Sequence, residues 1–462
     1  MKLKLINLWE SLRLSFWFIP TLMVLTAISM SFLIVRVDRV LQTDAIRFFG
    51  FLYTGSPEGA RSVLSTIASS MMTVTGVTFS ITIVVLNLAS SQFGPRLLRN
   101  FMQDRSIQFV LGIFVASFIY CLLVLRSIKT IGADIFVPNF SVSLAVVLAL
   151  LDVGVLIFFI HHIATAIQAD EVIAETSREL EANIKRLFTE ELNSTTRVNI
   201  KEKQTRHHES EVHHYIHYLT SRHNGYLQAV DYDKLLQVAK NNDFLIRLQL
   251  RPGQFVVAGS RLLTIGSKKK FNIDLSEGII DAFIFGNLRT PEQDAEYSIH
   301  QLVEVAIRAL SLGVNDPYTA MACVDQLGSA LCYLAKKKFP PLYRFDEQDK
   351  PRLQMKPLTY SGMLNAAFDQ IRQYGRTSIA VTIRLLETLT LIAEQTRHPD
   401  QRRAIHRQAN MILRASQETL FERNDREDTQ KRYQLLLCAL NEFKDEDGSY
   451  EISSVMRGGD SR

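Results

Sequence analysis

The sequence has few cysteines, and their spacing follows no pattern. Cys121, Cys323, Cys332 and Cys438 are scattered over 462 residues, and no C-x-x-C pair occurs. Neither a disulfide framework nor a zinc site is therefore indicated. The formal net charge is only +5, which gives no basis for expecting a nucleic-acid partner.

Motifs of the common enzyme classes are missing as well. The chain has no Walker loop, no dinucleotide-binding fingerprint, no H-E-x-x-H, no G-x-S-x-G and no protein-kinase motif set. Each of these patterns supplies the phosphate cradle, metal ligands or nucleophile that its chemistry requires. We therefore expect no enzymatic activity, no catalytic residue, no cofactor and no bound metal.

Charge is scarce in four long apolar stretches near the N-terminus, at 16–35, 62–91, 107–125 and 140–160. Each is long enough to cross the ~30 Å hydrocarbon core of a bilayer as a helix. They predict an α-helical membrane protein with four transmembrane helices and the lipid bilayer as its partner.

The orientation follows from lysine and arginine. These residues number six in 30 positions on one side of the membrane (1–14 and 91–106) and six in 40 on the other (36–61 and 126–139). This density favours an N-terminus and a large C-terminal part in the cytoplasm.

The second stretch has no charge, yet thirteen of its thirty residues are Ser, Thr or Asn. At 3.6 residues per turn, many of them share one helix face, with an apolar face on the other side. We call this polar face the hydroxyl stripe; it consists of Ser62, Thr66, Ser69, Thr73, Gly76, Ser80, Asn87 and Ser91.

Two interpretations fit the hydroxyl stripe. Facing water, it would line a path for small ions where several such helices converge. Facing protein, its small residues would let helices pack closely and bond back to their own carbonyls. Asn87 favours water, because back-bonding alone does not satisfy an amide. We name Ser69, Thr73, Ser80 and Asn87 as candidate pore-lining residues.

The fourth stretch carries a carboxylate at its centre, Asp152, in L-A-L-L-D-V-G-V-L. An ionised carboxylate in lipid is costly, so an intramembrane Asp is a functional candidate. Asp152 joins the pore-lining candidates because it would hold a cation or proton beside the hydroxyl stripe. The alternative is a neutral, hydroxyl-bonded side chain that fixes helix packing.

We predict a cytoplasmic α+β part after the transmembrane domain (1–163). It comprises a helical connector (164–224), a small β-rich module (225–270), a helical domain (271–445) and a disordered tail (446–462). Six histidines lie between positions 207 and 223, and His213 and His217 have the spacing of metal ligands on a helix. No Cys or acidic pattern completes a metal site there.

Polar residues gather around a predicted helix corner, S-L-G-V-N-D-P at 311–317. Gly313 would end one helix, and Asp316-Pro317 would cap and begin the next. We expect Arg289 and Asp294 to pair with Asn315 and Asp316 at this corner. The four residues then form either a site for a small ligand or ion, or a purely structural corner.

Four motifs in this order carry a resemblance to a known family. They are L-N-L-A-S-S-Q-F-G-P-R-L-L-R-N-F, G-Y-L-Q-A-V-D, R-P-G-Q-F-V-V-A-G and A-L-S-L-G-V-N-D-P-Y-T-A. From about residue 10 to about residue 440, the chain resembles a bacterial family of multi-pass inner-membrane proteins known only as a domain of unknown function. Gly94 and Leu312 stand where that family usually has Ser and Pro. The resemblance implies a bacterial membrane location and no activity.

Together these features favour a homo-oligomeric protein of the bacterial inner membrane that conducts or binds small inorganic ions. Four spans per subunit are too few to enclose a wide pore alone, so the second helices of several subunits would line it. The cytoplasmic part would assemble or gate the path. The alternative is a membrane-anchored sensor or scaffold whose cytoplasmic helices bind a protein or small ligand.

Overall fold

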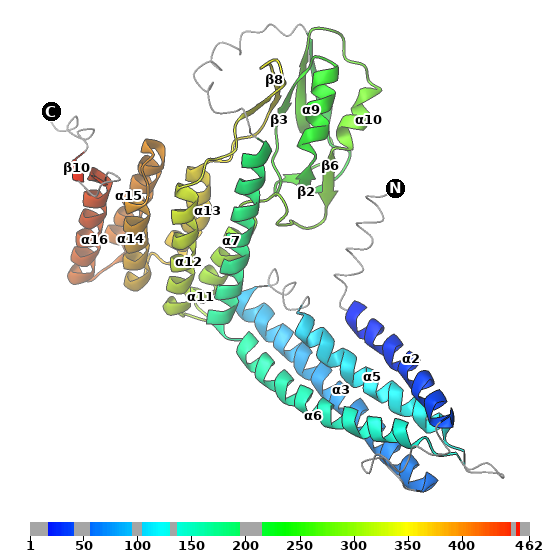
Figure 1. The fold of residues 1–462 in the computed structure, drawn as a ribbon. Coiled ribbons are helices and arrows are strands. Elements are labelled where there is room, and N and C mark those ends of the chain that lie inside the picture. Colours follow the sequence, from blue (N-terminus) through cyan, green and yellow to red (C-terminus); the bar gives the residue numbers. More distant parts are fainter. Residues whose placement is uncertain are drawn as a thin grey trace, which may run out of the picture. The chain divides into compact units, whose positions relative to one another are not determined.

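The computed structural model describes residues 17–40, 56–94, 104–129, 136–194, 215–444 and 450–452. The chain forms two compact units, Met1–Glu171 and Val172–Arg462 (Figure 1). The first holds the four apolar helices, and the second combines small β-sheets with a helical bundle.

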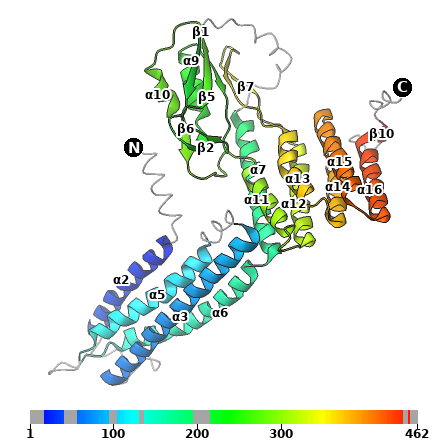
Figure 2. The ribbon, with the colours of Figure 1, turned by 180° about the vertical axis from the view of Figure 1, so that it is seen from behind.

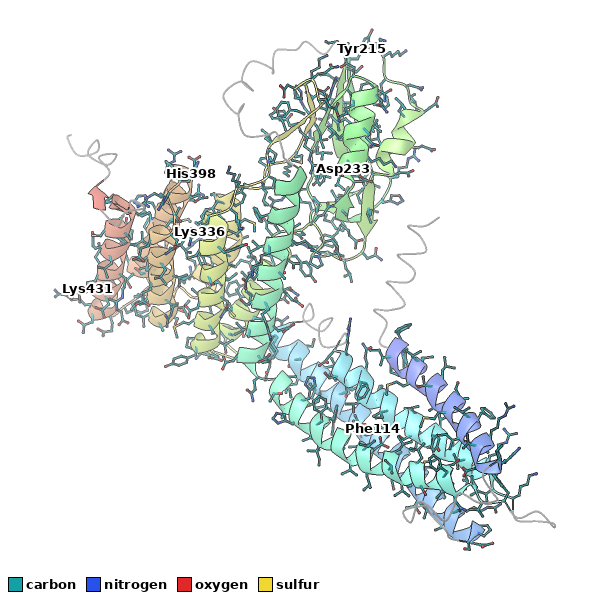
Figure 3. The ribbon with its side chains drawn as sticks, in the orientation of Figure 1. Phe114, Tyr215, Asp233, Lys336, His398 and Lys431 are labelled. Atoms are coloured by element: carbon teal, nitrogen blue, oxygen red, sulfur yellow. The ribbon has the colours of Figure 1, made fainter. Side chains whose placement is uncertain are left out.

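The four helices of the first unit are α2 (Phe18–Val40), α3 (Pro57–Phe93), α5 (Arg105–Ser127) and α6 (Asn139–Ala166). All four are long and apolar enough to cross a membrane, which confirms the prediction of four transmembrane helices. Helix α5 is central: 61% of its apolar window is buried, against 17–22% for the others. It packs on α2, α3 and α6, and Phe114 at its middle is fully buried (Figure 3).

Polar caps extend these helices beyond the apolar stretches that predict them. The Ser56 hydroxyl accepts a bond from Gly59 N, and Pro57 occupies the first turn, so α3 begins five residues before Ser62. It ends at Gly94, whose φ of 111° is open to glycine. Helix α3 is therefore about 55 Å long, well beyond the hydrocarbon core.

The second unit begins with α7 (Ala169–Ser194), which crosses the boundary between the units. A β-rich region follows, with β1 (Tyr215–Thr220), β2 (Gly225–Val230), α9 (Tyr232–Asn241), β3 (Leu245–Leu248), β4 (Phe255–Val256), β5 (Arg261–Ser267), α10 (Leu275–Ile280) and β6 (Phe283–Gly286). Strands β7 (Tyr343–Phe345) and β8 (Pro351–Gln354) come later in the chain and complete it.

These strands form a five-stranded sheet of order β1-β5-β3-β8-β7 and a three-stranded sheet of order β4-β2-β6. All neighbours are antiparallel except β3 and β8, which pair Ile246 with Leu353. Apolar residues of both sheets and of α9 share one core, in which Leu227, Leu235 and Leu263 are fully buried. Because β1, β6, β7 and β8 lie outside 225–270, the β-rich region is larger than the sequence predicts.

The helical bundle consists of α11 (Tyr297–Ala309), α12 (Pro317–Ala335), α13 (Tyr360–Tyr374), α14 (Ile379–Glu394), α15 (Pro399–Thr419) and α16 (Arg423–Asn441). Successive helices run up and down, and both views show them side by side (Figures 1 and 2). Helix α7 contacts this bundle through hydrogen bonds from Ser177 Oγ to Gln326 Oε1 and from Asn183 Nδ2 to Ser298 Oγ. Its Ile173, Leu180 and Ile184 are buried. Of the predicted tail, the structure describes β10 (Tyr450–Ile452), paired with β9 (Glu442–Lys444).

Candidate functional site

The hydroxyl stripe lies on the outside of the four-helix unit. Ser69, Thr73, Ser80 and Asn87 are all exposed. The face of α3 that packs on the other spans runs through Leu64, Ala68, Met71, Thr78, Val85 and Ala89. At 100° per residue the two faces lie about 180° apart. The polar face of α3 is thus uncovered, and the opposite, mainly apolar face is packed. Ile81 and Leu88, which the helical period assigns to the apolar side, are exposed.

Half of the twelve hydroxyls of α3 bond to the helix itself. Thr66, Thr73 and Ser80 donate to the carbonyls four residues earlier, at 2.8, 3.0 and 2.9 Å. This back-bonding lowers the cost of placing a hydroxyl in an apolar medium. Each hydroxyl oxygen still has a free lone pair that can accept a bond from outside the helix.

Asn87 and Gly76 differ from these hydroxyls. Asn87 makes no hydrogen bond to any residue that the structure describes, and its amide has two donors and an acceptor to satisfy. A Cβ built on Gly76 would meet no atom within 4 Å. The stripe therefore has open space in front of it and an unsatisfied amide near one end.

Asp152 lies inside the same unit. It is 1% exposed, and neither carboxyl oxygen has a hydrogen-bond partner among the described residues. Buried Ser117 and Cys121, one turn apart on α5, are near enough to interact with it, without a hydrogen bond of normal geometry. A carboxyl group in this place can hold a proton or face a small cation.

The five pore-lining candidates therefore do not share one surface. The four residues of α3 face outwards, whereas Asp152 of α6 faces inwards towards α5. The expectation that Asp152 lines the same path as the hydroxyl stripe is corrected. The reason is that α6 is apolar on nearly every side, so its sequence does not indicate which face packs inside.

Carboxylates that the sequence did not single out hold both ends of α6. Asp38 of α2 accepts bonds from Phe140 N, Ser141 N and Ser141 Oγ at 3.0, 2.9 and 2.5 Å. Asp104, the N-cap of α5, lies 2.6 Å from His162 Nε2 near the other end. Asp38 stands between two arginines in R-V-D-R and so resembles an ordinary charged flank. No sequence signal identifies it.

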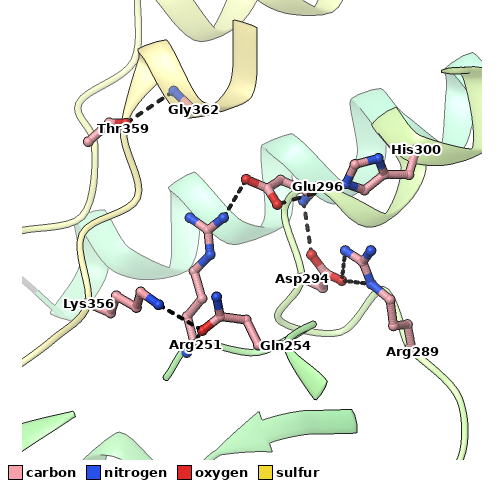
Figure 4. Close-up of polar contacts among 9 residues, drawn as sticks. All are labelled: Arg251, Gln254, Arg289, Asp294, Glu296, His300, Lys356, Thr359 and Gly362. Atoms are coloured by element: carbon pink, nitrogen blue, oxygen red, sulfur yellow. Dashed lines mark hydrogen bonds and ion pairs between the residues drawn. The ribbon is translucent and has the colours of Figure 1, made fainter. Parts of the chain in front are cut away.

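Arg289 and Asp294 bind each other at the start of α11 (Figure 4). Arg289 Nε donates to Asp294 Oδ2 at 2.8 Å, and Asp294 Oδ1 accepts from Glu296 N at 3.1 Å. Asp294 is 4% exposed. Burial raises the pKa of its carboxyl, and Arg289 partly offsets that rise.

A second ion pair lies beside the first. Arg251, which follows β3, donates to Glu296 Oε1 at 2.5 Å, and the Gln254 amide accepts from Arg251 N and from Lys356 Nζ (Figure 4). These contacts join the β-rich region to the first turn of α11. The charges satisfy one another, so this cluster works as a clamp between two parts of the second unit. Sequence reasoning missed Arg251 and Glu296 because they are 45 positions apart.

Asn315 and Asp316 lie at the opposite end of α11. The Asp316 carboxylate caps α12 by accepting from Tyr318 N, Thr319 N and Thr319 Oγ1. The Thr319 hydrogen bond holds the pKa of Asp316 below its usual range. Thirteen residues of helix, about 20 Å, separate this cap from Arg289 and Asp294. The expected pairing of the four residues does not occur.

Two further expectations change, one about the corner and one about the histidines. Asn315, with φ of 49°, adopts the left-handed conformation that was expected of Gly313. His217 lies in strand β1 and stacks on Phe271, while His213 lies outside the described residues. In the ranges that the structure describes, no group of three or more His, Cys, Asp or Glu could hold a metal ion.

Comparison with known proteins identifies relatives over most of the chain. A family described as "Predicted membrane protein (DUF2254)" matches residues 13–390. Uncharacterized proteins of Mycobacterium tuberculosis and Mycobacterium bovis are 29% identical over 383 residues, covering 81% of this chain and 71% of theirs. No solved structure matches the chain. The chain therefore belongs to the DUF2254 family of predicted membrane proteins.

Proposed function

We propose that this protein is a homo-oligomer in which the α3 helices of several copies face one another and form a path for small ions. The observation that carries the proposal is the position of the hydroxyl stripe. It is exposed on the outside of a single chain, about 180° from the face of α3 that packs.

The energetics of the bilayer support this arrangement. In a lone subunit the stripe would face lipid. Thr66, Thr73 and Ser80 tolerate lipid by back-bonding. The Asn87 amide has no hydrogen-bond partner among the described residues, so its partners must come from water or from another copy. Copies that meet through their stripes enclose these groups and give them water or one another as partners.

Asp152 has a separate role in the proposal. It is the buried carboxylate behind the path and binds a proton or a cation inside each subunit. Its unpartnered oxygens support this role, because a group that only fixed packing would have its bonding satisfied.

The proposal places the protein in the bacterial inner membrane, with both termini in the cytoplasm and the second unit assembling or gating the path. Two observations support it. The relatives are bacterial, and Cys323, Cys332 and Cys438 are free thiols, as expected in a reducing compartment.

Ion flux from proteoliposomes of the purified full chain tests the proposal. The variant Ser80→Leu/Asn87→Leu fills the stripe with apolar side chains, and we expect it to abolish flux. The matched control is Ser65→Leu/Ser70→Leu, two exposed serines of α3 outside the stripe, and it should conduct like the parent.

Equal flux in both variants would contradict a path along α3. A parent that forms dimers and passes no ion under voltage, tension or pH change would instead favour a membrane-anchored sensor or scaffold. The clamp at α11 and the cap of α12 would then be the framework of its binding unit.

A further inference from the structure

One end of the helical bundle displays large apolar side chains that are exposed among the described residues. Leu312 is 105% exposed, Phe421 95%, Tyr318 77% and Tyr374 58%. Single exposed apolar residues are common, but a group of them at one place marks an interaction surface. We call these four residues the apolar end.

The apolar end comes from three loops, α11–α12, α13–α14 and α15–α16, which contact one another. A Cβ on Gly375 would lie 3.4 Å from Leu310 Cδ1, and Thr419 Oγ1 donates to Arg376 O at 2.6 Å. Lys336 and His398 mark the opposite end of the bundle, where the other loops lie (Figure 3).

The first turn of α7 lies at the level of the apolar end. Ser177 Oγ donates to Gln326 Oε1 at 2.7 Å, and the rings of Phe188 and Phe339 are 5.3 Å apart. The segment from Ser177 to Phe188 in α7 therefore runs alongside the segment from Gln326 to Phe339, which begins in α12, and both run in the same direction. Extending both backwards puts Ala169, the start of α7, level with Pro317, the start of α12.

The chain reaches α7 directly from a transmembrane helix. Helix α6 ends at Ala166, and only Ile167 and Gln168 come before α7. Three peptide steps span at most about 11 Å. The start of α7, and with it one side of the apolar end, is therefore tethered within a short distance of the membrane surface.

We infer that the apolar end is seated on the lipid bilayer, with Leu312 and Phe421 inserted among the headgroups. Two tyrosines beside a leucine and a phenylalanine match the amphipathic and apolar side chains that settle at a membrane interface. Exposed Arg376 and Arg423 are accompanied by exposed Glu422, so apolar insertion rather than charge attraction holds the contact.

Site-directed fluorescence on the full chain tests this inference. Leu312→Cys and Phe421→Cys are labelled with an environment-sensitive dye in a Cys332→Ser/Cys438→Ser background and reconstituted in phosphatidylcholine–phosphatidylglycerol vesicles. Both side chains are almost free of contacts, so their replacement leaves the fold intact. The matched control is Leu391→Cys, 59% exposed near the opposite end of α14.

Lipid-borne nitroxide should quench the labels at 312 and 421 several-fold more than the label at 391, and iodide should show the reverse order. Labels at 312 and 421 that iodide quenches as strongly as the label at 391 would overturn the inference. Protection from both quenchers would also overturn it, since protein, and not lipid, would then cover the apolar end.

Discussion

Asp152 in the membrane unit and Asp294 in the second unit are both nearly fully buried, with exposures of 1% and 4%. Asp294 has a guanidinium and a backbone N–H bound to its two oxygens. Asp152 has no hydrogen-bond partner for either oxygen within the described ranges. The Asp294 carboxylate thus fixes the loop before α11, whereas the Asp152 carboxyl makes no comparable contact with a described residue.

This difference distinguishes a buried carboxyl group that stabilises the fold from one that has no stabilising partner among the described residues. A carboxylate that only supports a fold is retained with its partners, as Asp294 is. One buried without partners in a membrane helix costs stability and is kept for another reason. The comparison is therefore the basis on which we propose a functional role for Asp152 and a supporting role for Asp294.

The largest expected effect is that of Asp294→Asn. The change leaves Arg289 beside a neutral amide and should destabilise the first turn of α11 by about 3 kcal/mol. Amide hydrogen exchange of α11 should accelerate roughly a hundredfold. Exchange at the parental rate would mean that the ion pair does not support α11. Asp294 could then no longer serve as the structural counterpart of Asp152.

Gly253→Ala would place a methyl group against the Asp294 carboxylate. Gly253 has φ of 89°, and a Cβ there would lie 2.2 Å from Asp294 Oδ2, so we expect a loss of about 2 kcal/mol in thermal unfolding. Gly259→Ala is the control: its φ is 85°, but nothing lies within 4 Å of its Cβ. It should cost only about 1 kcal/mol. Equal losses would show that the contact with Asp294 is immaterial.

Asp316→Ala removes the cap of α12 and should cost about 1 kcal/mol. Because the pKa of Asp316 is lowered in the folded state, its ionised form stabilises the fold above the ordinary Asp pKa of about 4. That stabilisation is lost as the pH falls through the folded pKa. Unfolding of parent and variant between pH 3 and pH 6 (about one unit below and two above that pKa) should converge at the acid end. If the difference in unfolding free energy between parent and variant did not depend on pH, the negative charge of Asp316 would not be the source of the stabilisation.

Asp152→Asn should have the smallest effect on stability, within about 1 kcal/mol or even favourable, because no partner loses a bond. Ion flux should fall strongly if the carboxyl group binds the proton or cation. Detergent melting temperature and flux are measured on the same preparation. A large loss of stability with flux retained would make Asp152 a packing residue like Asp294.

The spans were predictable because long uncharged apolar stretches leave few alternatives. The amphipathic face of α3 was predictable as well, since the Ser and Thr positions follow the helical period. The inward direction of Asp152 was not, because α6 is apolar all round and packing alone selects its buried face. Capping by Ser56 and Asp104 lengthened two helices past their apolar stretches.

In the second unit, distance along the chain limited prediction. The pairing of β3 with β8 joins Ile246 to Leu353, and no local sequence pattern predicts a pairing over that distance. Arg289, Asp294 and Asp316 looked close in sequence, but the rigid length of α11 keeps the first two away from the third. The sequence correctly indicated that these three residues make ordered polar contacts, but it did not predict that Arg289 and Asp294 pair with each other and not with Asp316.

The most direct measurement for the ion path is the reaction of cysteines in α3 with a charged, water-soluble thiol reagent in membranes. Ser69→Cys, Thr73→Cys, Ser80→Cys and Asn87→Cys lie on the stripe. Met72→Cys and Phe79→Cys, 59% and 44% exposed, lie on its flank as controls. We predict fast reaction at the four stripe positions and slow reaction at the controls. Equally slow reaction at all six would mean that the stripe meets lipid or dry protein, and would contradict a hydrated path.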